Sequence, residues 1–368
     1  MTNGRKGRFV FMYICKCFYA GFPVDSYQMG LHMKKIVSFL CMGVFAFSTY
    51  AQDSNLRYYL LLGAEQAEDL TASYLEPVSE GLLFALTGGW YNDARVKKTW
   101  EIDVSLITNG SFVPKDKLEQ EIDISRFENL SVVGGGNVIK IPTILGSSNS
   151  RVRLAALLDG QSFEFDAPTG LGLISTNLLP SAFLQAGVGL PANSEFVFRY
   201  FPKLHIDDAS IGILGFGLKH ELSETIGFMN NWPVAVSGMV AYTRLSAEYE
   251  FETNGVFTGE DQLIDVALDT WMFELIGSTK FPTYNVYGGV GYVTGESVYA
   301  VKGEYDIVTP LRTVEFNDPF DVEDSIDGIR ANIGAKADWG RFHLNLDYTF
   351  QGYNNLSLGL GYTILKGK

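Results

Sequence analysis

Polar side chains that could take part in chemistry recur at every second position near the end of the chain. His343, Asn345 and Asp347 share one face of a predicted strand, and Ser357 follows in the next one. These are the residue types of a serine hydrolase. Residues two apart on a strand are about 7 Å apart, however, which is too far for a direct proton relay. We therefore expect the protein not to be an enzyme.

Two other motifs could bind a metal ion or a phosphate group, but each has a simpler structural interpretation. Five carboxylates between residues 318 and 327 supply the oxygen ligands that Ca²⁺ prefers, but their spacing is not that of an EF-hand. A solvated acidic loop is the better interpretation. Gly134-Gly135-Gly136 lacks the Lys-Ser/Thr of a phosphate-binding loop and indicates a turn. No metal ion or cofactor is predicted.

The spacing of the polar residues is part of a strict alternation over residues 329–364. Apolar side chains alternate with polar or small ones in three segments of about ten residues, 329–338, 341–350 and 355–364. This length and period are typical of transmembrane β-strands. The same pattern, less pure, occurs at 100–106, 195–200 and 241–251.

If the apolar face of these strands contacts lipid, the polar face lines an enclosed lumen. Such residues could steer a solute or hold a plug, or they could form a mutually satisfied network that fills the barrel. The network is the better interpretation, because buried charges are normally paired. The predicted lumen residues are Arg244, Glu248, Arg330, Lys336, Asp338, Arg341, His343 and Asp347.

Backbone hydrogen bonding dictates a closed sheet if the chain is integral to a membrane. Each unpaired backbone group in hydrocarbon costs several kcal/mol, so no open sheet edge can face lipid. The pattern allows nine strands between residues 181 and 364 and five more between about 82 and 176. This predicts an antiparallel barrel of about 14 strands, with 12 as the alternative. Short and long connectors alternate imperfectly, and they place both termini in the periplasm.

The first 51 residues have the features of a secretory signal. Met33-Lys34-Lys35 precedes an apolar run over 36–47, and small residues lead to a predicted cleavage site after Ala51. Residues 1–32 are either a mis-assigned start or an extended leader. The chain has 28 basic and 42 acidic residues, for a net charge of −14. This charge excludes a nucleic-acid binder, which needs a basic face.

A helix is predicted over residues 64–86, with Pro77 kinking or breaking it. The organisation we expect is a leader at 1–51, a helical segment at 52–89 and a barrel at 90–368. The helix could be a hatch inside the lumen, a periplasmic helix that docks a partner, or a cap that only stabilises the barrel. Its candidate hatch residues are Tyr74, Leu75, Pro77, Leu82 and Phe84.

Several short blocks resemble a family of uncharacterised outer-membrane barrels from Bacteroidota. They are the Tyr-Leu-Glu-Pro-Val stretch at 74–78, Gly-Trp-Tyr-Asn at 89–92 and the stretch at 215–222. More distantly, the chain is similar to the FadL-like class of long-chain fatty-acid transporters. That resemblance implies 14 strands and an N-terminal hatch, and none of that class's ligand-binding residues can be matched here. The ending Lys366-Gly367-Lys368 departs from the usual terminal aromatic residue.

Together these features predict a Sec-exported protein of a Gram-negative outer membrane. The function we expect is passive transport of small hydrophobic molecules. The alternatives are a barrel that does not transport but serves as an envelope assembly or secretion partner, and a soluble periplasmic β-sandwich, which would alternate with its apolar face inside. The expected partners are membrane lipid, a hydrophobic small molecule and an envelope protein.

Overall fold

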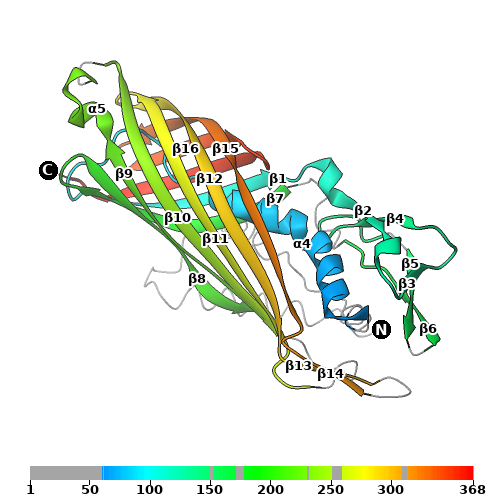
Figure 1. Cartoon of the computed structure of the whole chain (residues 1–368). Coiled ribbons are helices and arrows are strands. Elements are labelled where there is room, and N and C mark those ends of the chain that lie inside the picture. The colour runs from blue at the N-terminus through cyan, green and yellow to red at the C-terminus, as the bar shows by residue number, and fades with distance from the viewer. Residues whose placement is uncertain are drawn as a thin grey trace, which may run out of the picture. The chain divides into compact units, whose positions relative to one another are not determined.

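Ten antiparallel strands close into a barrel, in the order β1–β17–β16–β15–β12–β11–β10–β9–β8–β7, which returns to β1 (Figure 1). The strands are β1 (Ile102–Phe112), β7 (Leu178–Leu190), β8 (Ser194–Ile206), β9 (Ala209–Glu221), β10 (Val234–Glu250), β11 (Leu263–Thr279), β12 (Tyr284–Lys302), β15 (Phe320–Trp339), β16 (Phe342–Phe350) and β17 (Asn355–Leu365). The fold class is therefore all-β, as expected, and the sheet closes on itself, unlike a sandwich.

The computed structural model describes residues 60, 62–149, 152–158, 160–170, 178–206, 208–229, 232–250, 259–308 and 313–367. The predicted leader at 1–51 lies outside the described residues.

The predicted number of strands, 14 or 12, is wrong. Nine barrel strands do lie between residues 178 and 365, but the region before them contributes only β1. Its other strands have three to six residues, too few to cross a membrane. They form two small sheets outside the barrel, β2 (Glu119–Asp123) with β4 (Val138–Pro142), and β3 (Leu130–Val132) with β5 (Arg153–Leu158) and β6 (Gln161–Asp166).

The connectors separate the two ends of the barrel. One end, the short-turn end, carries turns 191–193, 280–283 and 340–341, and also a longer connector with α5 (Leu222–Thr225) and the 3-10 helix η3 (Gly227–Met229). The other, the long-loop end, is where β1 ends and β7 begins, and the described residues between them include the 3-10 helices η1 (Lys115–Leu118) and η2 (Ile124–Arg126). Strand β1 begins at the short-turn end, because Ile102 pairs with Leu365 and Val188.

The outer face of the barrel carries an apolar belt. Leu344, Leu346, Leu358 and Leu360, on neighbouring strands, are 37–55% exposed. Exposed aromatic side chains flank the belt, as they do at the two interfaces of membrane barrels. They are Phe281, Tyr284, Trp339, Phe342 and Tyr362 toward the short-turn end, and Tyr200, Trp271, Tyr292 and Phe350 toward the long-loop end, where the half-buried Tyr242 lies beside Trp271.

Strands β10, β11, β12 and β15 extend past the aromatic row at the long-loop end, and their polarity reverses there. Beyond Tyr242, Trp271 and Tyr292, the outward positions on β10, β11 and β15 are charged, as at Arg244, Asp269 and Asp327. The inward positions are apolar instead, as at Leu245, Val322 and Ile326. Arg244 and Glu248 therefore face outward, contrary to the prediction that they line the lumen, because this part of β10 lies outside the belt.

The acidic stretch at 318–327 is not a loop. The connector after β12 forms a hairpin of β13 (Glu304–Val308) and β14 (Thr313–Asn317), and β15 then begins at Phe320. Most of the carboxylates therefore lie on a strand.

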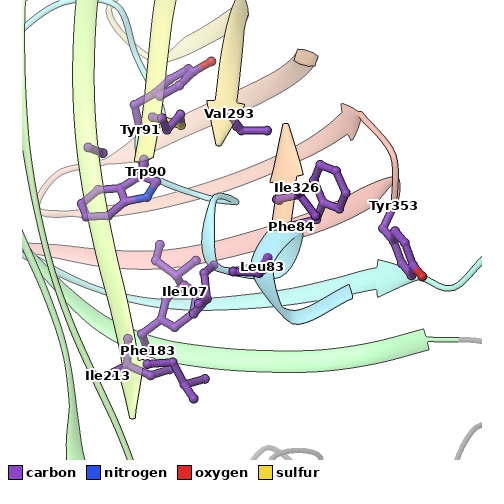
Figure 2. Packing of buried hydrophobic residues seen from close by; sticks show 14 of the residues in the cluster. Leu83, Phe84, Trp90, Tyr91, Ile107, Phe183, Ile213, Val293, Ile326 and Tyr353 are labelled. Carbon is purple, nitrogen blue, oxygen red and sulfur yellow. The ribbon is translucent and has the colours of Figure 1, made fainter. Parts of the chain in front are cut away.

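Helix α4 (Ala64–Leu86) runs through Pro77 without ending there, and its axis changes direction along its length (Figure 1). Its first half packs with β2–β6 and with the parts of β12 and β15 at the long-loop end. Together they surround one core, which includes Leu70, Ile141 and Val322. Its second half enters the barrel core, where Leu83 and Phe84 lie near Ile107 and Ile326 (Figure 2). Among the described residues, no helix is long and apolar enough to cross a membrane.

Because of the belt, we expect the loss of stability caused by an outward-facing charge to depend on the position of that charge along the strand. We expect Leu358→Arg to destabilise the barrel by about 2–4 kcal/mol, because the charge would enter the middle of the hydrocarbon layer. Ser246→Arg, outward but beyond the aromatic row, should cost about 0–1 kcal/mol. Urea unfolding of the protein in lipid bilayers measures both, and equal costs would contradict the position of the belt.

Candidate functional site

The chain runs through the lumen before it forms the barrel wall. Helix α4 ends at Leu86 among barrel strands, and β1 begins at the opposite, short-turn end. Residues 87–101, the lumen segment, connect the two, and the Trp100 amide donates to the Gly189 carbonyl at 2.8 Å. Leu60 and the start of the helix pack at the long-loop end instead. The helix therefore starts at the long-loop end.

Arg199 on β8 holds the last turn of the helix. Its side chain is fully buried and donates to the carbonyls of Leu86 at 2.8 Å and Gly88 at 2.9 Å. The guanidinium stacks on Trp90 and Phe183, at 4.0 Å from each ring centre. A helix ends with unpaired carbonyls and a partial negative charge, so a buried cation there is stabilising.

Arg330 on β15 reaches the same helix end from another part of the wall. Its Nη1 donates to the Thr87 carbonyl at 2.8 Å, and its Nε lies 3.4 Å from a Glu274 oxygen. Tyr91 of the lumen segment donates to the other Glu274 oxygen at 2.9 Å. The cation on β15 thus connects the helix end to a carboxylate of the neighbouring wall.

The remaining carbonyls of the last turn also have donors from the barrel. The Gln351 amide donates to Phe84 at 3.2 Å, and the Asn109 amide donates to Ala85 at 3.1 Å. Each carbonyl from Phe84 to Gly88 therefore accepts a hydrogen bond from a barrel side chain. The lumen forms a receptor for the C-terminus of one helix, which we call the helix-end receptor (Asn109, Arg199, Arg330 and Gln351).

A second network fixes the lumen segment nearer the short-turn end. Lys97 lies 2.6 Å from Glu195 and 3.1 Å from Asp103. Lys219 lies 2.9 Å from Glu195 and donates to the Asp93 carbonyl at 3.0 Å. These charges are buried and mutually compensated, which is the condition for tolerating them inside a protein.

The Asp93 carboxylate is a further anchor of this network. It pairs with Arg95 at 2.6 Å and accepts from Ser278 at 2.7 Å. Lys336 lies 4.0 Å from it and 3.2 Å from Asp338. Lys336 and Asp338, both predicted to line the lumen, face inward and belong to this network.

His343 and Asp347 face inward but do not act on each other. The His343 Nε2 lies 3.2 Å from Asp103 and 3.3 Å from Ser105, so one nitrogen faces both groups and no acid–base–nucleophile relay forms. Asp347 accepts from the Tyr287 hydroxyl at 3.1 Å. Among the described residues, no His, Cys, Asp or Glu cluster could hold a metal ion.

Two inward-facing glycines give the lumen segment room. A Cβ on Gly189 would lie 2.0 Å from the Lys98 carbonyl oxygen, and one on Gly289 would lie 2.3 Å from the Tyr91 hydroxyl. A glycine inside a strand marks such a close approach of another chain segment.

The last turn of α4 and the lumen segment occupy the lumen. A cavity beside Trp90 and Lys97 measures about 10 Å³, room for about one water molecule. A larger cavity of about 440 Å³ opens at the long-loop end, and we call it the mouth groove. Its lining is Glu80 and Phe84 of α4, Pro114, Asp116, Lys117, Ser325, Ile326, Asp327, Gly352 and Tyr353.

The candidate hatch residues lie along the helix between the two cores. Phe84 stacks on Tyr353 with ring centres 5.8 Å apart, and the Tyr74 hydroxyl donates to the Thr169 carbonyl at 2.9 Å. Pro77 is buried, and Leu75 and Leu82 pack against the barrel core. Both the lumen and the long-loop end therefore hold the helix.

Some of the predicted lumen residues face inward in the structure and others do not. Arg330, Lys336, Asp338, His343 and Asp347 face inward, whereas Arg341 is exposed in a short turn and donates to the Ile364 carbonyl at 2.9 Å. The prediction that Arg341 lines the lumen is wrong, because the strand ends at Trp339. Sequence reasoning missed Asp93, Lys97, Glu195, Arg199, Lys219 and Glu274. For the four strand residues, Glu195, Arg199, Lys219 and Glu274, the signal was a charged side chain at an inward position. Asp93 and Lys97 lie in the lumen segment and had no such signal.

Asp324 faces α4 beyond the membrane belt. Burial is the largest cause that raises its pKa above the usual range, and the nearby Glu80 and Glu76 carboxylates add to the increase. Its Oδ2 atom is buried and has no hydrogen-bond partner in the described part of the chain. Folding therefore favours the protonated form, and this carboxyl group weakens the contact of β15 with the helix at neutral pH.

We expect loss of Arg330 to be severe. Arg330→Ala leaves Glu274 as an uncompensated buried charge and should cost about 3–5 kcal/mol in urea unfolding. Arg341→Ala, at the exposed turn, should change the stability by less than about 0.5 kcal/mol. Arg330→Met combined with Glu274→Gln removes both charges and should recover most of the loss. Equal losses of stability in the two alanine variants would contradict the role of Arg330 in the helix-end receptor.

We expect Asp324 to make stability depend on pH. Because its pKa is higher in the folded state, its favourable contribution is complete below the ordinary pKa of aspartate and is lost as pH rises through the higher value. Asp324→Asn should stabilise the protein by on the order of 0.5 kcal/mol at neutral pH, since solvent screens part of the effect. Thermal unfolding across pH should flatten in this variant, and unchanged pH dependence would contradict the assignment.

Comparison with solved structures shows similarity to bacterial outer-membrane barrels at low identity. Ail, the attachment invasion locus protein of Yersinia pestis, is 10% identical, with 72% of this chain and 99% of that chain covered and a TM-score of 0.25. The translocator domain of the autotransporter NalP from Neisseria meningitidis is 14% identical, with 80% and 98% covered and a TM-score of 0.27. The outer membrane protease OmpT from Escherichia coli is 10% identical, with 72% and 97% covered and a TM-score of 0.24.

These similarities are too weak to identify a function, and they give no support to the expected similarity to fatty-acid transporters. No curated protein matches the chain. A family profile matches residues 33–364, which is most of the sequence. The chain belongs to the family of unknown function DUF6588.

Proposed function

We propose that the protein is an outer-membrane barrel that is sealed by its own N-terminal segment and anchors a folded module at the membrane surface. The apolar belt between two aromatic rows supports the membrane location, because such a surface is stable only against lipid. The short-turn end faces the periplasm in this proposal, as in other outer-membrane barrels. The long-loop end then faces the exterior.

The single observation that carries the proposal is the filled lumen. The last turn of α4 and the lumen segment occupy it, and their carbonyls and charges are bonded to the wall. The cavity beside Trp90 and Lys97 holds about one water molecule. A conformation of this kind passes no solute, so the barrel acts as an anchor.

The anchored part is the long-loop-end module. It consists of the first half of α4, strands β2–β6, the β13–β14 hairpin, and the parts of β12 and β15 at the long-loop end. It has its own apolar core, including Tyr305 and Phe320, apart from the barrel core. Helix α4 belongs to both cores, so the module is held to the barrel through the helix. This arrangement suits an envelope assembly or secretion partner.

Passive transport of small hydrophobic molecules is the second candidate. It is favoured by the mouth groove of about 440 Å³, whose lining includes Phe84, Ile326 and Tyr353 beside the helix. Passage would require α4 to leave the helix-end receptor, so the helix would be a hatch. The expected kinship with fatty-acid transporters and the Bacteroidota origin belong to this candidate.

Conductance across planar bilayers distinguishes the two. We expect the wild-type protein to be electrically silent, since the end of α4 and the lumen segment occupy the lumen. Arg199→Ala combined with Arg330→Ala removes the cations that hold the helix end and should produce openings, whereas Arg341→Ala should remain silent. A steady wild-type conductance of pore size would overturn the sealed barrel, and solute uptake into liposomes by the wild type would favour transport.

A further inference from the structure

Strand β15 has a free backbone edge at the long-loop end. On one side it pairs with β12 along nearly its whole length, up to Phe320 opposite Val301. On the other side its pairing with β16 stops at Ala331, opposite Phe350. Within the described part of the chain, no strand pairs with residues 320–330 on that side.

The backbone groups on this edge are available for pairing. In an antiparallel sheet, alternate residues direct their N–H and C=O groups to opposite neighbours. The Asp338 N–H donates at 2.8 Å to the Thr283 carbonyl beside β12, so the odd-numbered Ser325 directs its N–H to the opposite side, where β16 pairs further along. That N–H donates at 2.8 Å to the carboxylate of the adjacent Asp324 instead of to a strand. A local side chain therefore occupies the position of a missing strand.

The space beside this edge is open. Ser325, Ile326 and Asp327 line the mouth groove, whose opposite side is formed by η1 and the β16–β17 turn. The groove measures about 440 Å³, within the range of ligand sites. An added segment would thus have a backbone to pair with and room for its side chains.

The charges along the edge select the occupant. Asp321, Glu323 and Asp327 are exposed on the edge residues, and Glu80 and Asp116 line the groove. Lys117 is the only cation in the groove lining, and it already pairs with Glu76 at 2.6 Å and Glu80 at 3.0 Å. Like charges opposite each other destabilise strand pairs, so a second copy of this edge is disfavoured. A basic segment is complementary.

We propose that the free edge of β15 binds an extended, lysine- or arginine-rich segment of an envelope protein by strand addition. Main-chain hydrogen bonds to Ser325 and its alternate neighbours supply affinity, and the carboxylates supply selectivity. This site lies outside the lumen, so it does not depend on whether the barrel is sealed.

The test uses the full-length protein in detergent micelles and a fluorescent peptide in which lysine alternates with valine, as long as the free edge. We expect saturable binding in anisotropy titrations that weakens with salt. The same peptide with alternate amides N-methylated keeps its charge but cannot pair, so it should bind at least about tenfold more weakly. A glutamate–valine peptide should not bind.

Two variants test whether the peptide binds at the free edge of β15. Ser325→Pro removes an edge donor that β12 does not use, a substitution that edge strands tolerate, and should weaken binding about tenfold. Asp327→Lys should weaken binding by a similar factor and reduce its salt dependence. Glu315→Lys on the exposed β14 strand makes the same charge change away from the edge and should have little effect.

Equal affinity for the N-methylated peptide would show that charge alone attracts it and would overturn strand addition. Absence of peptide binding would also overturn the proposal. If Ser325→Pro instead changes the oligomeric state, the occupant is a second copy and the proposal is wrong. None of these outcomes depends on conductance, so failure here is distinct from failure of the sealed barrel.

Discussion

The buried end of a helix is the constraint on which this structure depends. The last carbonyls of α4 lie inside a barrel, and an unsatisfied buried polar group costs a few kcal/mol. The wall satisfies them with side chains from β1, β8, β15 and the β16–β17 turn. Because these donors come from around the barrel, they fix the position of the helix from several sides.

The reversal of polarity along the strands divides the molecule into a membrane part and a part outside it. Within the belt, apolar side chains face outward and charges are enclosed; beyond it, the sheet has an apolar inner face that packs with α4 and the small sheets. One helix serves both environments, since Leu75 packs against both cores. The barrel and the long-loop-end module are therefore mechanically connected, whichever of the two functions holds.

Alternation predicted the barrel well where strands stay within the belt, as over 329–364, because lipid imposes one polarity on all of them. It failed at 241–251, where Arg244 and Glu248 face outward, since period two does not state which face is enclosed. The prediction of five barrel strands between about 82 and 176 is wrong, because the tertiary position of the short strands β2–β6 leaves no trace in their composition. Arg199 has the same local pattern as any lumen residue, and only the three-dimensional path of residues 87–101 shows what it binds.

Hydrogen exchange of the α4 backbone in the bilayer-embedded protein tests the central claim most directly. A helix end held by the receptor should open only with the barrel, so the amides of Leu83–Gly88 should exchange as slowly as those of β8 and β15. A helix that merely rests in the mouth would fray at its end on the time scale of an isolated helix. Fast exchange there beside slow exchange in the strands would contradict the account.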